Sequence, residues 1–361
     1  MEKENEFLKK QEEIKNKIGS GAYKALADII LDGIGKAIQK ITRTRKPISS
    51  WFSACMLGLF VGLCVSGIAL LLGDNISFEL FLAGIWGIAL GTLLVFLTKV
   101  NGRVVYGTFR EYLVDSFLSL EDLTDADTKT TAMFDVRRQL SVSLFIGIIA
   151  GFLGVLIWMF YKGAFPGISS LIGVVIVAFL GGTAVYWVIP LMILPHQLSK
   201  YNLKLYAADP SNSEVIDRIS DMLSFIVYMG AVVSAFFTIG LVVLNLLNPI
   251  TAVIYLVFAS WGPLIVLFVN NQYGISKIIV KAKWKMLNGI QKKIEVLQQK
   301  DEIPTKETLE HIGALMDYHD RIRNTRNSAL DFRESLKFVN SLLLPLIAFL
   351  LANLNTLLTI F

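Results

Sequence analysis

Long stretches without a charged residue alternate with short, strongly charged segments along this chain. A helix needs ~20 mostly apolar residues to cross the hydrocarbon core of a bilayer, and each charge-free stretch is about that long or longer. The pattern predicts an all-α polytopic integral membrane protein. The charge-free stretches are residues 47–73, 80–98, 139–161, 163–199, 222–276 and 338–361.

The lengths of these stretches predict seven membrane spans. The stretch 163–199 suits one long helix, entered at Pro166-Gly167 and left at Pro190 or Pro195. The stretch 222–276 is too long for one crossing, and the turn signal Asn248-Pro249 divides it into 222–245 and 250–272, because proline disfavours helical geometry at the residue before it. Three helical hairpins plus a lone C-terminal span result.

Charge predicts the orientation of these spans. The four predicted inner segments hold 11, 6, 3 and 13 Lys and Arg residues, and Lys162 alone lies in an outer loop. Basic loops stay on the cytoplasmic side of a membrane, so the N-terminus is expected to be cytoplasmic and the C-terminus to lie at the outer face. Hydrophobic residues at 54% and charged residues at 17% agree with a membrane protein, in the plasma membrane or an inner membrane.

The spans divide the chain into eight expected segments. They are a cytoplasmic region 1–50, a first hairpin 51–98, a cytoplasmic helical loop 99–140, a second hairpin 141–194, a cytoplasmic loop 195–221, a third hairpin 222–272, a cytoplasmic helical arm 273–340 and a seventh span 341–361.

The N-terminal region combines a charged stretch with an amphipathic helix. Residues 1–20 are expected to be frayed, with a hinge at Gly19-Ser-Gly21, and residues 22–41 to form the helix. Two interpretations of this helix compete. It lies in the inner leaflet, with Arg43, Arg45 and Lys46 as candidate contacts to anionic lipid head groups, or it packs on the cytoplasmic ends of the spans.

The other cytoplasmic segments show helix and turn signals. Residues 121–127 are expected to form an acidic break after the second span, and the capping-box spacing of Ser211 and Glu214 predicts a helix start. Within 273–340, two apolar helical stripes flank a turn at 301–304. A helix–turn–helix arm ~35 to 40 Å long is therefore expected, either folded on itself or in contact with neighbouring subunits.

Residue types that carry chemistry are scarce. The charge-free runs hold no Asp, Glu, Lys or Arg, whereas proton and ion pathways are usually marked by such groups at depth. Glu307 and His311 share a helix face near His319, but no HExxH or cysteine pair supports a metal site. Cys55 and Cys64 lie on opposite faces of one helix and cannot bond to each other. We expect no catalytic residue, cofactor or metal, and no nucleic-acid partner.

Small and polar residues form patterns within the spans. Glycines recur at intervals of four, as in Gly147 and Gly151, which predicts close helix packing. The last span carries a stripe of small and polar side chains on one face, and the fifth span carries a weaker version that includes Ser224, Tyr228 and Thr238. The last-span stripe comprises Ser341, Pro345, Ala348, Ala352, Asn355, Thr356 and Thr359. Such a face either packs against other helices or lines a wet conduit.

Three functions are compatible with these features. The first is a non-enzymatic homo-oligomeric ion channel or pore-forming effector, in which the seventh span lines the conduit. The second is a membrane scaffold or signalling component that acts through its cytoplasmic helices. The third is a secondary carrier, although no inverted repeat or pair of broken helices is visible.

Overall fold

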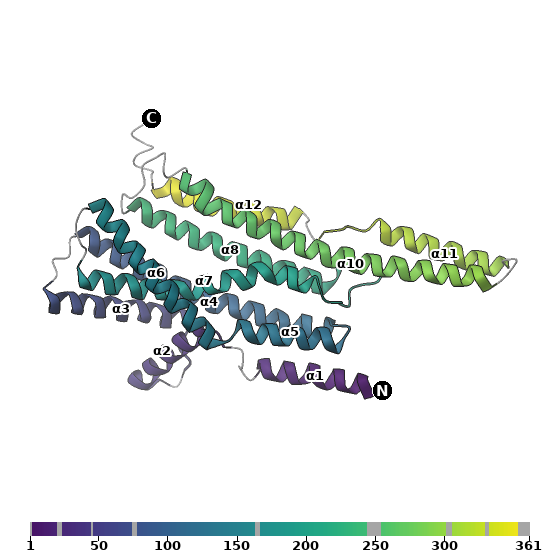
Figure 1. The fold of residues 1–361 in the computed structure, drawn as a ribbon, viewed down its shortest axis with the longest axis horizontal. Helices are drawn as coiled ribbons and strands as arrows, with labels where there is room; N and C mark the ends of the chain where they lie inside the picture. Colours follow the sequence, from purple (N-terminus) through teal and green to yellow (C-terminus); the bar gives the residue numbers. More distant parts are fainter. Residues whose placement is uncertain are drawn as a thin grey trace.

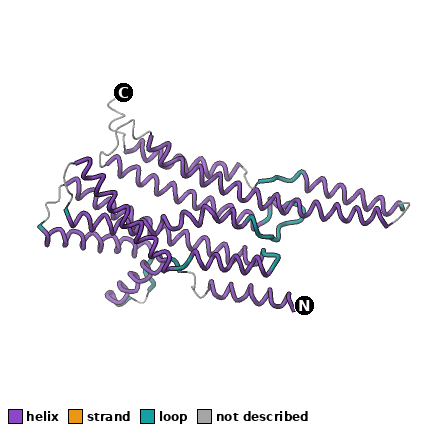
Figure 2. Tube along the Cα trace, viewed as in Figure 1, coloured by secondary structure: helices purple, strands orange, loops and turns teal. Residues whose placement is uncertain are grey.

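The protein is built almost entirely of helices (Figures 1 and 2). The computed structural model describes residues 2–19, 24–44, 46–73, 78–162, 167–243, 254–300, 305–328 and 332–352. Helix accounts for 89% of the structure, and the described residues form no strand, which confirms the all-α prediction. The α-helices are α1 (Glu2–Gly19), α2 (Leu26–Thr42), α3 (Ser50–Leu72), α4 (Phe78–Thr108), α5 (Leu120–Met133), α6 (Val136–Lys162), α7 (Ile168–Leu198), α8 (Glu214–Val243), α10 (Gly262–Lys300), α11 (Lys306–Arg323) and α12 (Phe332–Ala352).

Six helices in the described part of the chain are long and apolar enough to cross a membrane. They are α3, α4, α6, α7, α8 and the helix that runs from the short π-helix η4 (Tyr255–Trp261) into α10. The lone C-terminal span stays a prediction, because the apolar part of α12 is described only over Ser335–Leu351 and residues 353–361 lie outside the described residues. The predicted turn at Asn248-Pro249 also lies outside them.

The apolar helices form two packed units. One contains α3, α4, α6 and α7, and the other contains α8, η4–α10 and α12. Helices α4 and α8 join the units where the Trp86 ring stacks on Phe236, with 4.4 Å between the ring centroids. The indole of Trp86 also covers Gly240, one turn further along α8, where a side chain would collide with it.

Glycine sets the spacing between α6 and α7. A Cβ atom placed on Gly147 would lie 3.0 Å from the Cα atom of Phe179, and one on Gly151 would lie 2.8 Å from a methyl group of Val175. The backbones therefore approach closely at this crossing, as small residues allow between helices in lipid. This confirms the close packing predicted from these two glycines.

Helix α7 does not end at Pro190 or Pro195, as the sequence predicted, but continues through both to Leu198. A proline inside a helix removes one backbone hydrogen bond and weakens its neighbours. The Asn270 side chain of α10 donates a hydrogen bond of 2.5 Å to the carbonyl of Met192 in this weakened stretch. Gly274, one turn later on α10, lets the helix pass against Pro195. Support from a neighbouring helix explains why α7 continues.

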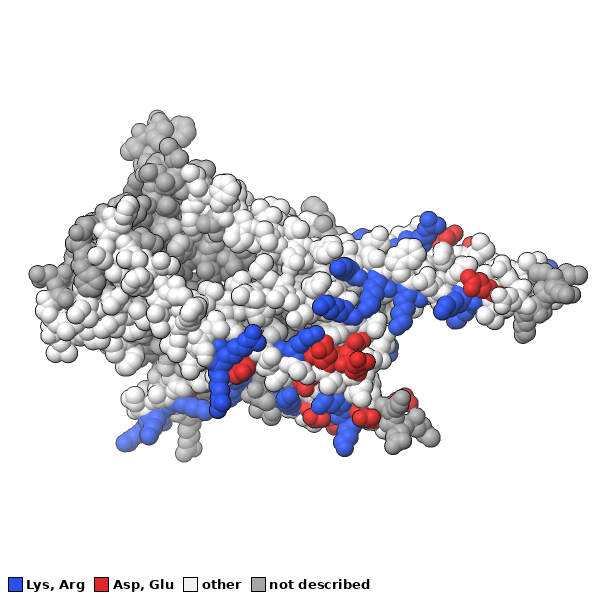
Figure 3. Space-filling model, viewed as in Figure 1, with Lys and Arg blue, Asp and Glu red and all other residues white. Residues whose placement is uncertain are grey.

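In addition to the packing between the apolar helices, a core of buried residues lies at one end of the molecule. This end carries α1, α5 and the α10–α11 arm (Figure 1), and most of the Lys and Arg visible in Figure 3 gather on it. We call it the basic end. Buried residues of α1, α5, α7, α8 and α10 meet there, among them Ile14, Leu123, Trp187, Ile219 and Ile279.

The prediction that residues 1–20 are frayed is wrong, because they form α1. Ile14 and Ile18 are buried in the core of the basic end, and the Gln11 side chain donates to the carbonyl of Val114 at 2.9 Å. The Lys17 amino group lies 3.4 Å from an Asp127 carboxylate oxygen. Apolar residues on one face and polar contacts beside them together dock this otherwise charged helix. The proposed hinge residues 20 and 21 lie outside the described residues.

The acidic residues 121–127 belong to α5 and do not form a break. The Ser119 side chain accepts a hydrogen bond from the backbone N–H of Asp122, which caps the helix. Carboxylates in the first turn of a helix interact favourably with its N-terminal dipole, so the acidic cluster favours a helix start. The helix start predicted from Ser211 and Glu214 is confirmed, because α8 begins at Glu214, after a short 3₁₀ turn at Pro210–Asn212.

The predicted arm folds on itself. Helices α10 and α11 lie side by side and project from the bundle (Figure 1), and they share a small core of Leu287, Ile290, Ile294, Ile312 and Ile322. The Thr305 side chain caps α11 by accepting a hydrogen bond from the Thr308 backbone N–H. The turn between the two helices lies outside the described residues.

Candidate functional site

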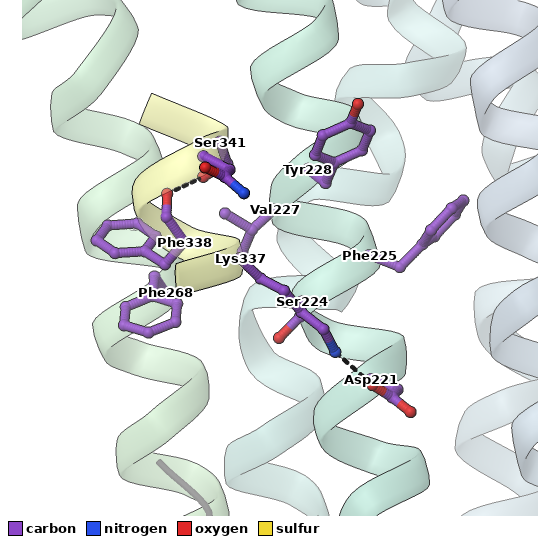
Figure 4. Close-up of a pocket in the computed structure, with 10 residues that line it drawn as sticks. Asp221, Ser224, Phe225, Val227, Tyr228, Phe268, Lys337, Phe338 and Ser341 are labelled. Atoms are coloured by element: carbon purple, nitrogen blue, oxygen red, sulfur yellow. Dashed lines mark hydrogen bonds and ion pairs between the residues drawn. The ribbon is translucent and has the colours of Figure 1, made fainter. Parts of the chain in front are cut away.

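The polar stripes of α8 and α12 meet in a groove that contains a cavity of about 350 Å³. Helix α12 packs closely on α8, and Figure 4 shows its lower turns between α8 and α10. The cavity combines polar groups with aromatic walls. Its lining residues are Asp221, Ser224, Phe225, Val227, Tyr228, Phe268, Lys337, Phe338, Asn340 and Ser341. The sequence had predicted the polar face of each helix separately, but not that they would face each other.

Helical spacing explains why these side chains share one face. On α8, Asp221, Ser224 and Tyr228 follow each other at intervals of three and four residues, and Lys337 and Ser341 are four apart on α12. Side chains at these intervals lie above one another on a helix. Both helices thus present a polar row to the groove between them.

An ion pair stands at one end of the groove. The Lys337 amino group lies 2.7 Å from an Asp221 carboxylate oxygen, with 37% and 50% of the two side chains exposed (Figure 4). An exposed pair of this kind contributes only ~0–1 kcal/mol to stability. Its position is more informative, because each residue directly precedes a charge-free run, 222–276 or 338–361. Both charges therefore lie at the same boundary between polar and apolar sequence.

Aromatic stacking and a hydrogen bond hold α12 in place. The rings of Phe268 on α10 and Phe338 on α12 stack with 3.9 Å between their centroids. The Trp261 indole N–H, at the end of η4, donates to the carbonyl of Leu342 at 3.1 Å. Hydrogen bonds between helices in lipid contribute about 0.6 kcal/mol on average, so these contacts orient α12 more than they stabilise it.

A second polar cluster lies deeper along α8. The Ser234 hydroxyl donates to the Ser260 hydroxyl of η4 at 2.6 Å, and Thr238 donates to the backbone carbonyl of Ser234 at 2.7 Å. Thr238 and Ser260 are almost fully buried. A π-helix such as η4 is rare and often occurs at functional sites. Polar contacts thus join α8 and η4 well inside the apolar part of the chain.

The described part of the predicted last-span stripe faces the rest of the same chain. Ser341 is 1% exposed and Ala348 is 6% exposed, and Pro345 between them is also buried. The Ser341 hydroxyl donates to the Phe338 carbonyl at 2.7 Å. Helix α12 ends at Ala352, whose side chain is not described. Asn355, Thr356 and Thr359 lie outside the described residues.

The predicted head-group residues follow α2. Arg43 is exposed and adopts the left-handed conformation that ends the helix, with a φ of 53°. Lys46 is also exposed, and its carbonyl accepts a hydrogen bond from the Gln39 side chain at 2.8 Å. Arg45 lies outside the described residues.

Residues considered for metal binding do not come together in the described structure. Glu307 and His311 are exposed on α11, and a His319 ring nitrogen lies 3.3 Å from an Asp320 carboxylate oxygen. Among the described residues, no group of three or more His, Cys, Asp and Glu side chains is arranged to hold a metal ion. Cys55 and Cys64 are both free thiols, as their spacing predicted.

Sequence reasoning did not select Asp221, Lys337, Phe268 or Phe338 as site residues. Asp221 and Lys337 are the last charged residues before two charge-free runs, and this shared position is the signal that could have identified them. The two phenylalanines carried no such signal, because an apolar ring inside a span has the same pattern whether it faces lipid or another helix.

Comparison with protein families, with curated proteins and with solved structures found no match for this chain.

Proposed function

We propose that this protein is a non-enzymatic membrane channel that works as a homo-oligomer, and that the groove between α8 and α12 borders its conduit. The observation that carries the proposal is the meeting of two uncharged polar rows, from Ser224 and Tyr228 on α8 and from Asn340 and Ser341 on α12, around a cavity. Polar groups keep the lining of an ion pathway wet, whereas hydrophobic constrictions gate by dewetting.

The groove is a better conduit wall than the outer face of α12. Side chains on that outer face are apolar and 41–50% exposed, namely Leu336, Val339, Leu343, Ile347 and Leu350. Such a face suits lipid or a neighbouring subunit. In the sequence, the stripe continues through small residues to Asn355, Thr356 and Thr359 toward the end of the span, so the same face carries small or polar side chains along its whole predicted length.

The Lys337–Asp221 pair gives the proposed conduit a charged mouth. In this proposal the basic end is cytoplasmic, as positively charged loops favour, and the pair lies at the inner membrane boundary. Rings of charged side chains select ions by sign. Lys337→Gln should therefore increase the relative permeability to cations, and Asp221→Asn should increase that to anions.

Planar bilayers containing the purified protein test this proposal. We expect ionic current, with a reversal potential in a KCl gradient that Lys337→Gln and Asp221→Asn shift in opposite directions. Asn340→Leu should change the conductance, whereas Val339→Leu, at the adjacent exposed apolar position, is the matched control and should not. Absence of current from the wild type at all voltages and salt concentrations would contradict the channel.

Two further measurements locate the conduit. Asn355→Leu and Thr359→Leu should change the current if the stripe continues along it. Single cysteines at positions 348 and 352 test the geometry by cross-linking. Disulfide-linked dimers, in chains without Cys55 and Cys64, would place α12 at a central axis, whereas chains that stay unlinked would favour a conduit between α8 and α12 of each subunit.

A scaffold is the second candidate, because the arm keeps an uncovered apolar surface. Leu309 and Met316, which lie on one face of α11, are each 56% exposed, and Trp284 of α10 is 59% exposed. If the arm joins subunits, Leu309→Asp combined with Met316→Asp should lower the oligomer mass measured by light scattering. An unchanged mass would remove this argument for the scaffold.

A further inference from the structure

Helix α2 packs on the side of the bundle, and its surface has three sectors with different kinds of side chain. Figure 1 shows it beside the inner ends of α3 and α4, oblique to the long axis along which the other helices run. Ala27 and Leu31 are at most 1% exposed and pack against Ala54, Leu57 and Val95. One sector of the helix is therefore fixed to the spans.

A buried ion pair anchors a second sector of α2. The Lys99 amino group of α4 lies 2.5 Å from an Asp32 carboxylate oxygen and 3.9 Å from one of Asp28. The Lys99 side chain is 2% exposed, and lysine is almost never fully buried unless it is paired. Both acidic residues of α2 are thus directed toward the bundle, and they do not offset the charge of its outer surface.

The remaining surface of α2 is apolar on one side and basic on the other. Ile30, Ile34 and Ile41 fall within about 40° of one another at 100° per residue. Ile30 and Ile34 are partly buried at the edge of the core that α2 forms with the spans, whereas Ile41, at the C-terminal end of the helix, is 81% exposed. The exposed basic residues are Lys24, Lys36, Lys40, Arg43 and Lys46. Figure 3 shows Lys and Arg gathered along this helix and the adjoining bundle surface.

Aromatic residues mark the depth of this surface. Helix α3 begins at Ser50, only a few residues after α2 ends, and its first turn carries Trp51 and Phe52, which are 56% and 48% exposed. Tryptophan is enriched where a membrane meets water. The C-terminal end of α2 therefore lies next to the level at which lipid head groups begin.

From these observations we propose that α2 lies in the surface of the bilayer at the basic end and binds its anionic phospholipids. Ile41 and the uncovered parts of Ile30 and Ile34 enter the boundary between head groups and acyl chains, and Lys36, Lys40 and Arg43 extend toward the phosphates. The ion pair between Lys99 and Asp32 holds α2 against α4. This inference does not depend on the channel proposal.

Depth-dependent fluorescence quenching in nanodiscs tests the membrane contact. A fluorophore on Ile41→Cys, in the full-length chain with Cys55 and Cys64 replaced by serine, should be quenched by lipids that carry a spin label near the head group. A fluorophore on Lys9→Cys, an exposed position of α1, is the control and should not be quenched. Absence of quenching at position 41 would overturn the proposal.

Lipid charge is tested with the same probe. Quenching should be stronger in nanodiscs of phosphatidylcholine mixed with phosphatidylglycerol than in phosphatidylcholine alone, and high salt should remove the difference. Each positive charge removed from α2 should weaken the contact about fivefold. A triple glutamine variant at Lys36, Lys40 and Arg43 should therefore lose the difference between the two lipid compositions.

A matched variant controls for net charge. Glutamine at Lys285, Lys292 and Lys293, which are exposed on the arm, removes the same charge elsewhere and should leave quenching at position 41 unchanged. Equal quenching in both lipid compositions would overturn the preference for anionic lipid. An equal loss in the two triple variants would overturn the assignment of that preference to α2.

Discussion

The buried pair between Lys99 and Asp32 gives the sharpest prediction about stability. Methionine has a similar length and flexibility, so Lys99→Met removes the charge without leaving a large cavity. It leaves the carboxylates of Asp28 and Asp32 without their buried cation. Removal of one partner from a buried ion pair costs ~3–5 kcal/mol. The Asp32 side chain is 42% exposed and is partly solvated, so we expect a loss of about 2–3 kcal/mol.

The loss should appear as detachment of α2 from the spans. About 2 kcal/mol corresponds to roughly a 30-fold change in the ratio of docked to detached helix. A cysteine at Ala27, which is 0% exposed, in a chain without Cys55 and Cys64, reacts with a maleimide only when α2 detaches. The labelling rate should therefore rise by about that factor in Lys99→Met.

Two variants separate the ion pair from a general effect of charge. Lys285→Met removes an exposed lysine of the arm, outside the proposed lipid contact, and should leave the labelling rate unchanged. Asp32→Asn keeps Asp28, 3.9 Å from Lys99, and should have a smaller effect than Lys99→Met. If Lys99→Met labels no faster than the wild type, the pair does not hold α2 to α4 and the reasoning is refuted.

Three further predictions concern the rest of the molecule. Tyr201→Phe removes a 2.7 Å hydrogen bond to Asp125 and should lower the free energy of unfolding by about 1–2 kcal/mol, measured by denaturation. Burial raises the pKa of Tyr201 from 10.0 to about 12, so the stability that its neutral form contributes is present below pH 10 and is lost as the pH rises toward about 12. Between pH 10 and about 12, the melting temperature of Tyr201→Phe should therefore fall less steeply with rising pH than that of the wild type. Gly182→Ala should lower the melting temperature, because its Cβ atom would lie 2.8 Å from the Ser143 carbonyl oxygen, whereas Gly67→Ala, with nothing within 4 Å, should not. Trp261→Phe removes the hydrogen bond to Leu342 and should speed maleimide labelling of a cysteine at position 348, and an unchanged rate would show that stacking alone orients α12.

Span positions were predictable because lipid imposes a simple rule on sequence. A helix in the hydrocarbon core must be long and uncharged, and the charge-free runs therefore matched α3, α4, α6 and α7 directly. The continuation of α7 past Pro190 and Pro195 was not predictable. It depends on Asn270 and Gly274, which come more than seventy residues later in the chain and act only once α10 packs against α7.

Docking of short charged segments was also beyond sequence reasoning. Helix α1 carries only a few apolar residues, and its composition is typical of a frayed end. Ile14 and Ile18 are nevertheless buried, because α5 and the short helical turns at Phe109–Leu113 and Val114–Ser116 pack against α1 and provide a core that receives them. A local pattern shows which residues are apolar, but the partner that buries them is set by the tertiary fold.

The candidate site was predictable in its parts and not in its assembly. Periodicity placed Ser224 and Tyr228 on one face of α8, and Ser341 and Ala348 on one face of α12. That these faces oppose each other depends on the contacts of Phe268 with Phe338 and of Trp261 with Leu342. None of these three aromatic residues differs, by sequence pattern, from one that faces lipid.

The continuity of α10 has a mechanical consequence. Its 39 residues run unbroken from the apolar part of the chain to the tip of the arm, a length of about 58 Å at 1.5 Å per residue. If such a rod pivots near its apolar end, a tilt of about 5° moves its far end by about 5 Å. A partner bound at the far end of the arm would therefore change the tilt of the helix that packs beside α8 and α12.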